Sequence, residues 1–313
     1  MTDMRFDGRV ALVTGAGAGM GKVHALFLAS RGAKVVVSDA GTATDGTGAD
    51  SHLAQEVVDA IRAAGGEATP WIANLIEDEG ARGAVRHAVQ SYGRLDILIH
   101  NAGIALSGPY MEETADRMDR LLGVNTRAAC LMTREAWPVM AGQQHGRIVL
   151  IGSTAMYGMG GSTHYSTAKA SYLGLTRALA EEGGALGIKV NLVCPAAATR
   201  LVDTMDESPF KQWIFDTLKP ELVTPIVAYL GHDSCAVTGE AFSTAGGRLA
   251  KIVVGETRGI VDSDLTLEKI PGLLGRVLDE DQIDLNRNFS EFAPIMMNAL
   301  GYAAETEEAA PAD

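Results

Sequence analysis

Short apolar segments alternate with longer helical patterns along most of this 313-residue chain. Segments such as VALVTG and RIVLIGS are apolar without alternation, as expected for strands that are buried on both faces. The stretches between them place apolar residues at helical spacing. Because this order of elements builds a parallel sheet covered by helices on both faces, the sequence predicts an α/β, doubly wound (Rossmann) fold.

We expect a seven-stranded parallel sheet whose strands are joined by right-handed helical crossovers. The expected strands are residues 10–14, 34–38, 68–72, 95–100, 147–151, 189–193 and 241–244. The expected helices are residues 20–31, 55–64, 78–92, 121–141, 163–186 and 220–230.

A single domain with a C-terminal extension is the expected organisation. We assign residues 1–255 to the main domain and 256–302 to an extension that packs on this domain or on a neighbouring subunit. Residues 303–313 (AAETEEAAPAD) are expected to form a disordered acidic tail. A loop rich in glycine and threonine, residues 41–48, follows the second strand and is expected to be mobile and close to that strand's end.

Charge and composition exclude several classes of partner. The chain has 26 Lys and Arg against 39 Asp and Glu, a formal net charge of −13, which opposes binding to nucleic acid or to an anionic membrane. No apolar run approaches the roughly 18 residues that span a bilayer. The three cysteines are far apart in apolar segments, which favours a reducing compartment, and we expect a cytoplasmic protein.

Metal-dependent and hydrolytic chemistry find no support in the motifs. The histidines form no HxxxH pair and the cysteines no CxxC pair, so we expect no metal site. The G-x-S-x-G turn that exposes a nucleophilic serine is also missing.

A glycine-rich turn, TGAGAGMG, follows the first expected strand and leads directly into a helix. Glycine lets the main chain approach a phosphate closely, and the free N–H groups and dipole of the helix N-terminus face the anion. This arrangement predicts a dinucleotide pyrophosphate site. Its expected residues are Gly15, Gly17, Gly19, Met20 and Gly21.

Asp39 ends the second expected strand, at about the spacing of a carboxylate that binds the adenosine ribose. A carboxylate there accepts hydrogen bonds from both ribose hydroxyls and repels a 2′-phosphate, so we expect NAD as the cofactor. After the third strand, Asn74 and Leu75 are expected to border the adenine.

Tyr165 has a lysine four residues later, Lys169, which lies on the same face of a helix. At about 4 Å and an effective dielectric constant near 20, the ammonium would favour the phenolate by roughly 4 kcal/mol and lower the pKa of Tyr165 toward neutrality. Such a phenol is a candidate general base. Ser153 could hold a substrate oxygen beside it, and Asn125 is an amide in an apolar helix that needs a buried partner.

Together, TGAGAGMG, HNAG at residues 100–103, Asn125, Ser153 and YSTAK at residues 165–169 resemble the short-chain dehydrogenase/reductase superfamily. The resemblance implies that Tyr165 is the catalytic acid/base and that Lys169 binds the nicotinamide ribose and lowers the pKa of the tyrosine. It further implies that Ser153 orients substrate and that Asn125 holds a proton-relay water. Asn101, Ala102 and Gly103 would line the cofactor cleft.

Two later segments, VCPAAATR and residues 218–261, resemble the (3R)-hydroxyacyl-CoA dehydrogenases of the peroxisomal multifunctional enzyme type 2 group and its bacterial relatives. In this likeness Pro195 and Ala198 would contact the cofactor. The superfamily also pairs its long helices between subunits, which implies a homo-oligomer, either dimer or tetramer.

The sequence therefore predicts an NAD-dependent oxidoreductase that interconverts a secondary alcohol and a ketone, with a 3-hydroxyacyl-CoA as a candidate substrate. A hydroxysteroid or alicyclic alcohol is the alternative substrate, and a non-catalytic NAD-binding sensor or scaffold is the alternative of another class. Residues 201–219 are a candidate lid or a plain packing helix. The lid would present Met205, Phe210, Trp213, Ile214 and Phe215, and the candidate cations for CoA phosphates are Arg200, Lys211 and Lys219.

Overall fold

The computed structural model describes residues 3–198 and 206–301, which form two compact units that divide after Ile252. The expected tail at 303–313, and two residues of the expected substrate region, Arg200 and Met205, lie outside the described residues.

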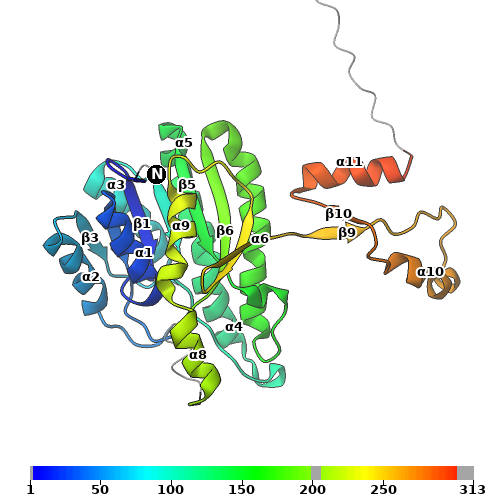
Figure 1. The fold of residues 1–313 in the computed structure, drawn as a ribbon, viewed down its shortest axis with the longest axis horizontal. Helices are drawn as coiled ribbons and strands as arrows, with labels where there is room; N and C mark the ends of the chain where they lie inside the picture. Colours follow the sequence, from blue (N-terminus) through cyan, green and yellow to red (C-terminus); the bar gives the residue numbers. More distant parts are fainter. Residues whose placement is uncertain (1–2, 199–205, 302–313) are drawn as a thin grey trace, which may run out of the picture. The chain divides into compact units, whose positions relative to one another are not determined.

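The first unit alternates strands and helices as expected (Figure 1). Its strands are β1 (Val10–Thr14), β2 (Lys34–Ser38), β3 (Ala68–Trp71), β4 (Ile97–His100), β5 (Gly146–Ile151), β6 (Ile188–Ala196), β7 (Ala241–Ala245) and β8 (Arg248–Ile252). Its α-helices are α1 (Gly19–Ser30), α2 (His52–Ala63), α3 (Asp78–Tyr92), α4 (Ala115–Leu122), α5 (Ala128–Gln143), α6 (Thr163–Gly183), α8 (Pro209–Thr217) and α9 (Thr224–Gly231).

The sheet runs in the order β3-β2-β1-β4-β5-β6-β7-β8, and the strands from β3 to β7 are parallel. The chain builds outward from β1 to β3, then crosses back to place β4 on the other side of β1. This reversal leaves a crevice at the carboxyl ends of β1 and β4, where ligands of doubly wound sheets bind.

The expected count of seven strands is one too low, because β8 adds to the sheet antiparallel to β7. The two strands are joined by Gly246 and Gly247, which both have positive φ angles of 54° and 86°. Two glycines with positive φ form the tight hairpin turn that suits twisted strands. The Gly-Gly pair was therefore an available signal for this strand.

Each strand of the central sheet contributes alternate side chains to two apolar layers. Ala11 and Val13 face the layer formed with helices α1, α2 and α9, whereas Val10 and Leu12 face the layer formed with α3, α5 and α6. Figure 1 shows these helices covering the two faces of the sheet. Burial on both faces explains why the strands are apolar without alternation.

The expected helix at 121–141 is interrupted by a π-helical turn, Gly123–Arg127, between α4 and α5. Gly123 permits close packing there, because a Cβ atom on it would lie 2.8 Å from a side-chain carbon of Ile76. The turn carries Asn125, which is completely buried. π-turns inside helices frequently mark functional sites.

The second unit contains β9 (Gly255–Thr257), α10 (Ile270–Val277), β10 (Ile283–Leu285) and α11 (Phe289–Ala299). Strands β9 and β10 pair as an antiparallel two-stranded sheet. None of the described residues from 253 to 301 is buried, although several are large and apolar. This extension therefore has no hydrophobic core of its own.

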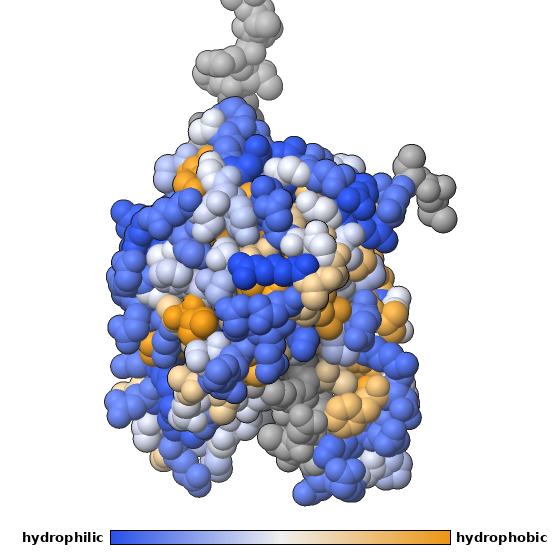
Figure 2. All heavy atoms as spheres, turned by 90° about the vertical axis from the view of Figure 1, so that its left-hand side faces the viewer, coloured by the Kyte–Doolittle hydropathy of each residue, from blue (hydrophilic) through white to orange (hydrophobic). Residues whose placement is uncertain are grey.

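Figure 2 shows the side of the molecule that carries α2 and β3. Its surface is mostly hydrophilic, with apolar residues scattered rather than gathered, as is usual for exposed surface. None of the described helices is both long enough and apolar enough to cross a membrane.

A buried carboxylate lies at the amino-terminal edge of the sheet. Asp96 is fully buried, accepts a hydrogen bond from the Val10 amide at 2.9 Å, and pairs with Arg94 at 2.6 Å and Arg9 at 3.0 Å. Burial by itself raises the pKa of this carboxyl, but the hydrogen bonds and the two guanidinium charges outweigh burial and lower it below the ordinary value of 3.8.

We predict that Asp96→Asn lowers the free energy of unfolding by about 3 kcal/mol, because it leaves two arginines without their buried partner. Because the folded-state pKa is lowered, the carboxylate stabilises the fold fully above the unfolded pKa of ~4 and loses this effect as the pH falls below it. The difference in free energy of unfolding between wild type and variant, measured with urea, should become smaller below pH ~4. Asp7→Asn, at an exposed pair with Arg5, should change little; an equal effect of both variants would contradict the prediction.

Candidate active site

The glycine-rich turn after β1 has the backbone shape that its sequence predicts. Gly15 and Gly19 adopt positive φ angles of 62° and 53°, and α1 begins at Gly19. A Cβ atom on Gly21 would lie 2.1 Å from the Gly15 carbonyl oxygen, and one on Gly15 would lie 2.9 Å from Cα of Ala102. Only glycine fits these positions, so the turn folds tightly around the start of α1.

The hydroxyl of Thr14 joins β1 to the chain after β4. Its oxygen accepts hydrogen bonds from the amides of Asn101 at 3.0 Å and Ala102 at 2.9 Å, and the side-chain amide of Asn101 donates to the Thr14 carbonyl at 3.0 Å. Because Oγ1 already accepts two amide hydrogens, its own proton is available to Nδ1 of His100 at 3.3 Å. His100 then carries its proton on Nε2, which donates to the Asn125 carbonyl at 3.4 Å.

His100 is neutral in this arrangement, since burial is the main cause that lowers its pKa to about 3. The hydroxyl of Tyr172 also donates to the Asn125 carbonyl. Strand ends β1 and β4 are thereby linked to the π-turn that carries Asn125.

Asp39 lies at the end of β2, and its carboxylate is held by two main-chain amides. Oδ2 accepts from Gly17 at 2.8 Å and Oδ1 accepts from Gly41 at 2.7 Å. These bonds fix the carboxylate beside the glycine-rich turn, and each oxygen keeps a lone pair for a further donor.

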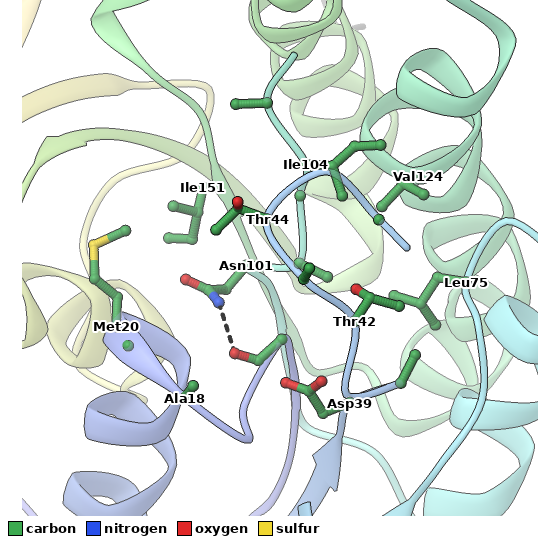
Figure 3. A pocket seen from close by; sticks show the side chains of 18 of the residues that line it. Ala18, Met20, Asp39, Thr42, Thr44, Leu75, Asn101, Ile104, Val124 and Ile151 are labelled. Carbon is green, nitrogen blue, oxygen red and sulfur yellow. Dashed lines mark hydrogen bonds between the residues drawn. The ribbon is translucent and has the colours of Figure 1, made fainter. Parts of the chain in front are cut away.

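A cleft runs along the carboxyl edge of the sheet from Asp39 to Tyr165 and Lys169, and Figure 3 shows part of it. The predicted site residues that line it are Gly15, Gly19, Met20, Asp39, Asn74, Leu75, Asn101, Ala102, Gly103, Tyr165 and Lys169. The predicted residues that do not line it are Gly17, Gly21, Asn125, Ser153, Pro195 and Ala198.

The residues outside the lining lie close behind it or at the end of β6. Gly17 and Gly21 shape the glycine-rich turn, as described above. Pro195 belongs to β6, and the Ala198 amide donates to the Leu218 carbonyl at 2.7 Å.

Sequence reasoning missed part of the lining. Residues 42–46, from the loop after β2, contribute Thr42, Ala43, Thr44 and Gly46, and further lining residues are Ala18, Ser38, Ala40, Ile104, Ala105, Val124, Ile151 and Gly152. The loop was expected to be mobile, yet it makes internal hydrogen bonds, including Ala43 N to Thr47 O at 2.8 Å and Gly46 N to Ala43 O at 3.0 Å. The unusual length of the connection between β2 and α2 was the available signal for its role.

Asn125 holds a buried amide whose orientation is fixed by two carbonyls. Nδ2 donates to the carbonyls of Ile104 and Leu121, both at 3.0 Å. Oδ1 is buried and finds no hydrogen-bond partner in the described part of the chain. A Cβ atom on Gly103 would lie 2.5 Å from this oxygen and 3.2 Å from Nζ of Lys169, so the unpaired oxygen and the ammonium lie on the same side of the cleft wall.

Lys169 is a buried cation that forms no ion pair with a carboxylate of the described residues. Its ammonium donates to the Ile151 carbonyl at 2.9 Å and lies 4.9 Å from the ring centre of Tyr172 and 5.8 Å from that of Tyr165. Burial lowers the pKa of Lys169 to about 8. The helix places Lys169 and Tyr165 on one face, as predicted.

The expected lowering of the Tyr165 pKa is wrong for this structure. Burial raises the pKa of the phenol above its ordinary value of 10, and the hydrogen bond with the Ser153 side chain lowers it only in part. The ammonium of Lys169 is directed at the Ile151 carbonyl and is closer to Tyr172, so burial decides the direction. The Ser153 side chain thus contacts the phenol. This position was expected for a serine that holds a substrate oxygen beside Tyr165.

The shape and the hydrogen-bonding groups at this edge of the sheet fit a dinucleotide. The glycine-rich turn offers a cradle that side chains would fill, and buried oxygens of Asn101 and Ser38 at this edge have no hydrogen-bond partner among the described residues. No group of three His, Cys, Asp or Glu residues suited to a metal ion occurs in the described part of the chain.

The expected lid is only partly described. In α8, Phe210 and Trp213 stack with ring centres 5.9 Å apart and are exposed, whereas Ile214 is buried. Lys211 is buried and pairs with Glu207 at 2.7 Å. His164 lies 3.9 Å from Glu113 and is mostly covered.

Comparison with known proteins decides the family. Residues 9–208 match the family model described as short chain dehydrogenase. The chain belongs to the short-chain dehydrogenase family. Family membership places it among oxidoreductases that act on CH–OH groups, and such proteins typically bind a nicotinamide cofactor.

Several relatives are much longer than the part that matches this chain. The chain is 37% identical over 282 residues to "Peroxisomal multifunctional enzyme type 2" of Drosophila melanogaster, covering 88% of this chain and 46% of that protein. The solved structure of full-length peroxisomal multifunctional enzyme type 2 from the same organism is similar, with a TM-score of 0.79 and 30% identity, covering 95% of this chain and 50% of that one. The chain thus spans about half the length of these relatives.

Another relative is similar along almost its whole length. "(2S)-[(R)-hydroxy(phenyl)methyl]succinyl-CoA dehydrogenase subunit BbsD" of Thauera aromatica is 34% identical over 256 residues, which cover 78% of this chain and 98% of that protein.

We predict that Gly21→Ala weakens binding of NADH at least about tenfold, because the new Cβ atom would collide with the Gly15 carbonyl and open the turn. NADH fluorescence titration measures the affinity. The matched control is Gly174→Ala in α6, where a Cβ atom meets nothing within 4 Å; it should leave NADH affinity unchanged and raise helix stability slightly. Equal affinities of Gly21→Ala and the control would contradict the proposed role of the turn.

Proposed function

We propose that this protein is an NAD-dependent oxidoreductase that interconverts a secondary alcohol and a ketone, with a 3-hydroxyacyl-CoA as the first candidate substrate. The observation that carries the proposal is the single cleft that joins a glycine cradle and Asp39 at one end to Tyr165 and Lys169 at the other. A dinucleotide bound at the glycine-rich turn would extend along the cleft toward the phenol. A redox reaction needs the cofactor and the acid/base in one continuous cleft.

NAD rather than NADP is favoured by Asp39. Its carboxylate is positioned by the amides of Gly17 and Gly41 and keeps acceptor capacity for ribose hydroxyls. A 2′-phosphate at this place would face a like charge.

The chemistry assigns a separate task to each residue. The nicotinamide, when bound, accepts or supplies the hydride. Tyr165 exchanges a proton with the substrate oxygen, and Ser153 hydrogen-bonds the same oxygen beside the phenol. Lys169 places a buried positive charge 5.8 Å from the centre of the phenol ring, and Asn125 offers Oδ1 to a water that would link this ammonium to solvent.

The raised pKa of Tyr165 has a directional consequence. The phenol keeps its proton at neutral pH and is ready to donate it to a ketone oxygen, as reduction requires. Oxidation of an alcohol needs the phenolate, so its rate should rise with pH more steeply than the rate of reduction.

The substrate proposal rests on the name of one relative and on the surface of α8. One relative's name specifies a CoA thioester with a neighbouring hydroxyl, and the exposed aromatic residues of α8 suit an apolar group. A hydroxysteroid or alicyclic alcohol would satisfy the same aromatic surface and is the second candidate. A non-catalytic NAD sensor is disfavoured, because such a protein would need neither Ser153 nor the buried Lys169 beside Tyr165.

A homo-oligomer is the proposed assembly. The extension from residue 253 onward buries none of its described residues, and its exposed apolar side chains include Leu267, Leu278 and Phe289. We propose that these side chains pack against the main domain or a neighbouring subunit, which would remove them from water. The cytoplasm stays the predicted location, while the names of several relatives contain the word peroxisomal.

We predict that Tyr165→Phe lowers kcat by about 10²- to 10⁴-fold and leaves the affinity for NADH nearly unchanged, because only the transferable proton is removed. Initial rates of NADH formation with secondary alcohols measure kcat. Tyr157→Phe is the matched control, since this tyrosine is exposed near the same helix and should keep full activity. Undiminished turnover by Tyr165→Phe would refute the proposed acid/base.

We predict that 3-hydroxybutyryl-CoA is oxidised with a kcat/KM at least about tenfold above that of free 3-hydroxybutyrate, because remote binding energy of CoA contributes to the transition state. The same assay should include a hydroxysteroid and cyclohexanol, each with NAD and with NADP. Higher kcat/KM for the steroid or cyclohexanol would replace the CoA proposal by the second candidate. Preference for NADP would contradict the role of Asp39.

A further inference from the structure

The connection between β2 and α2 contains a segment whose two ends lie close together. The Asp50 amide donates to the Gly41 carbonyl at 2.9 Å, so the ends of the segment 41–50 are already joined by a hydrogen bond. We call this segment the strap. A two-residue turn could make the same connection, because residues three apart form such a bond in a β-turn. The residues between are therefore not required to link the two elements.

The strap has a defined shape of its own. Asp45 accepts hydrogen bonds from the amide and the hydroxyl of Thr47 at 2.9 and 2.7 Å, and the Ala43 amide donates to the Thr47 carbonyl. A compact surface loop with joined ends and internal bonds is an Ω-loop, a type that is frequently functional.

The strap crosses to the far side of the cleft. The Ala105 amide, in the chain after β4, donates to the Thr44 carbonyl at 3.2 Å. Gly46 lies against Ile104, because a Cβ atom on it would be 3.2 Å from two side-chain carbons of that residue. Figure 3 shows Thr44 in the cleft, facing Asn101 and Ile151. The strap therefore spans the crevice between the β2 side and the β4 side.

We propose that the strap is a cofactor-binding element: residues 42–46 enclose the dinucleotide, and the contact of Thr44 and Gly46 with residues 104–105 is the clasp that opens for its uptake and release. The inference rests on the proposed function, because it requires a dinucleotide in this cleft. The clasp consists of one hydrogen bond and one small apolar contact, and Arg120 also lies close to Gly46. None of these contacts belongs to the sheet, so opening leaves the sheet intact.

The test replaces residues 42–49 of the full chain by two glycines, which keeps the Gly41–Asp50 hydrogen bond as a β-turn. Stopped-flow NADH fluorescence measures association and dissociation rates, and the midpoint of thermal unfolding reports whether the fold is kept. We expect NADH to dissociate at least about tenfold faster from the shortened protein than from wild type.

A matched pair of single variants tests the clasp without deletion. Gly46 and Gly48 both have positive φ angles, 83° and 74°, so alanine strains the backbone at either position. Only the Cβ atom at position 46 meets Ile104, whereas the one at position 48 meets nothing within 4 Å. Gly46→Ala should therefore accelerate NADH dissociation more than Gly48→Ala does.

The outcomes separate the inference from the function on which it rests. Unchanged dissociation rates in a shortened protein that binds NADH would overturn the strap alone and leave the proposed function standing. Equal rates for Gly46→Ala and Gly48→Ala would overturn the clasp. Failure of the wild-type protein to bind NADH would overturn the proposed function together with the inference.

Discussion

The site depends on the hydrogen bonds of the Thr14 hydroxyl. Thr14 is the last residue of β1, and its hydroxyl oxygen accepts hydrogen bonds from the amides of Asn101 and Ala102. The hydroxyl proton is then available to His100. Because β1 and β4 lie side by side at the reversal of strand order, this one group holds the glycine-rich turn and the opposite wall of the crevice in register. The cradle, the cleft wall and the π-turn of Asn125 are thus parts of one hydrogen-bonded unit.

Burial has opposite effects on the two ionisable groups of the candidate chemistry. It raises the pKa of Tyr165 and lowers that of Lys169, so it favours the neutral form of both side chains. More polar surroundings would therefore lower the pKa of Tyr165 and raise that of Lys169.

The order of strands and helices, the glycine-rich turn and the shared face of Tyr165 and Lys169 could be predicted, because each follows from local sequence. The π-turn that begins at Gly123 could not, and its close packing against Ile76, a residue distant in sequence, is visible only in the folded chain. The direction of the Tyr165 pKa shift was also out of reach, because it depends on where the Lys169 ammonium points and on how much water the fold excludes. The glycine and threonine pattern of residues 41–48 indicates a loop but not what it touches.

The two edge strands of the sheet, β3 and β8, carry features that discourage aggregation. β3 has only four residues and contains Pro70, which lacks an amide hydrogen, and β8 carries the charges of Arg248 and Lys251. Short length, proline and positive charge each discourage an incoming strand. Extension of the sheet into a fibre is therefore disfavoured at both edge strands.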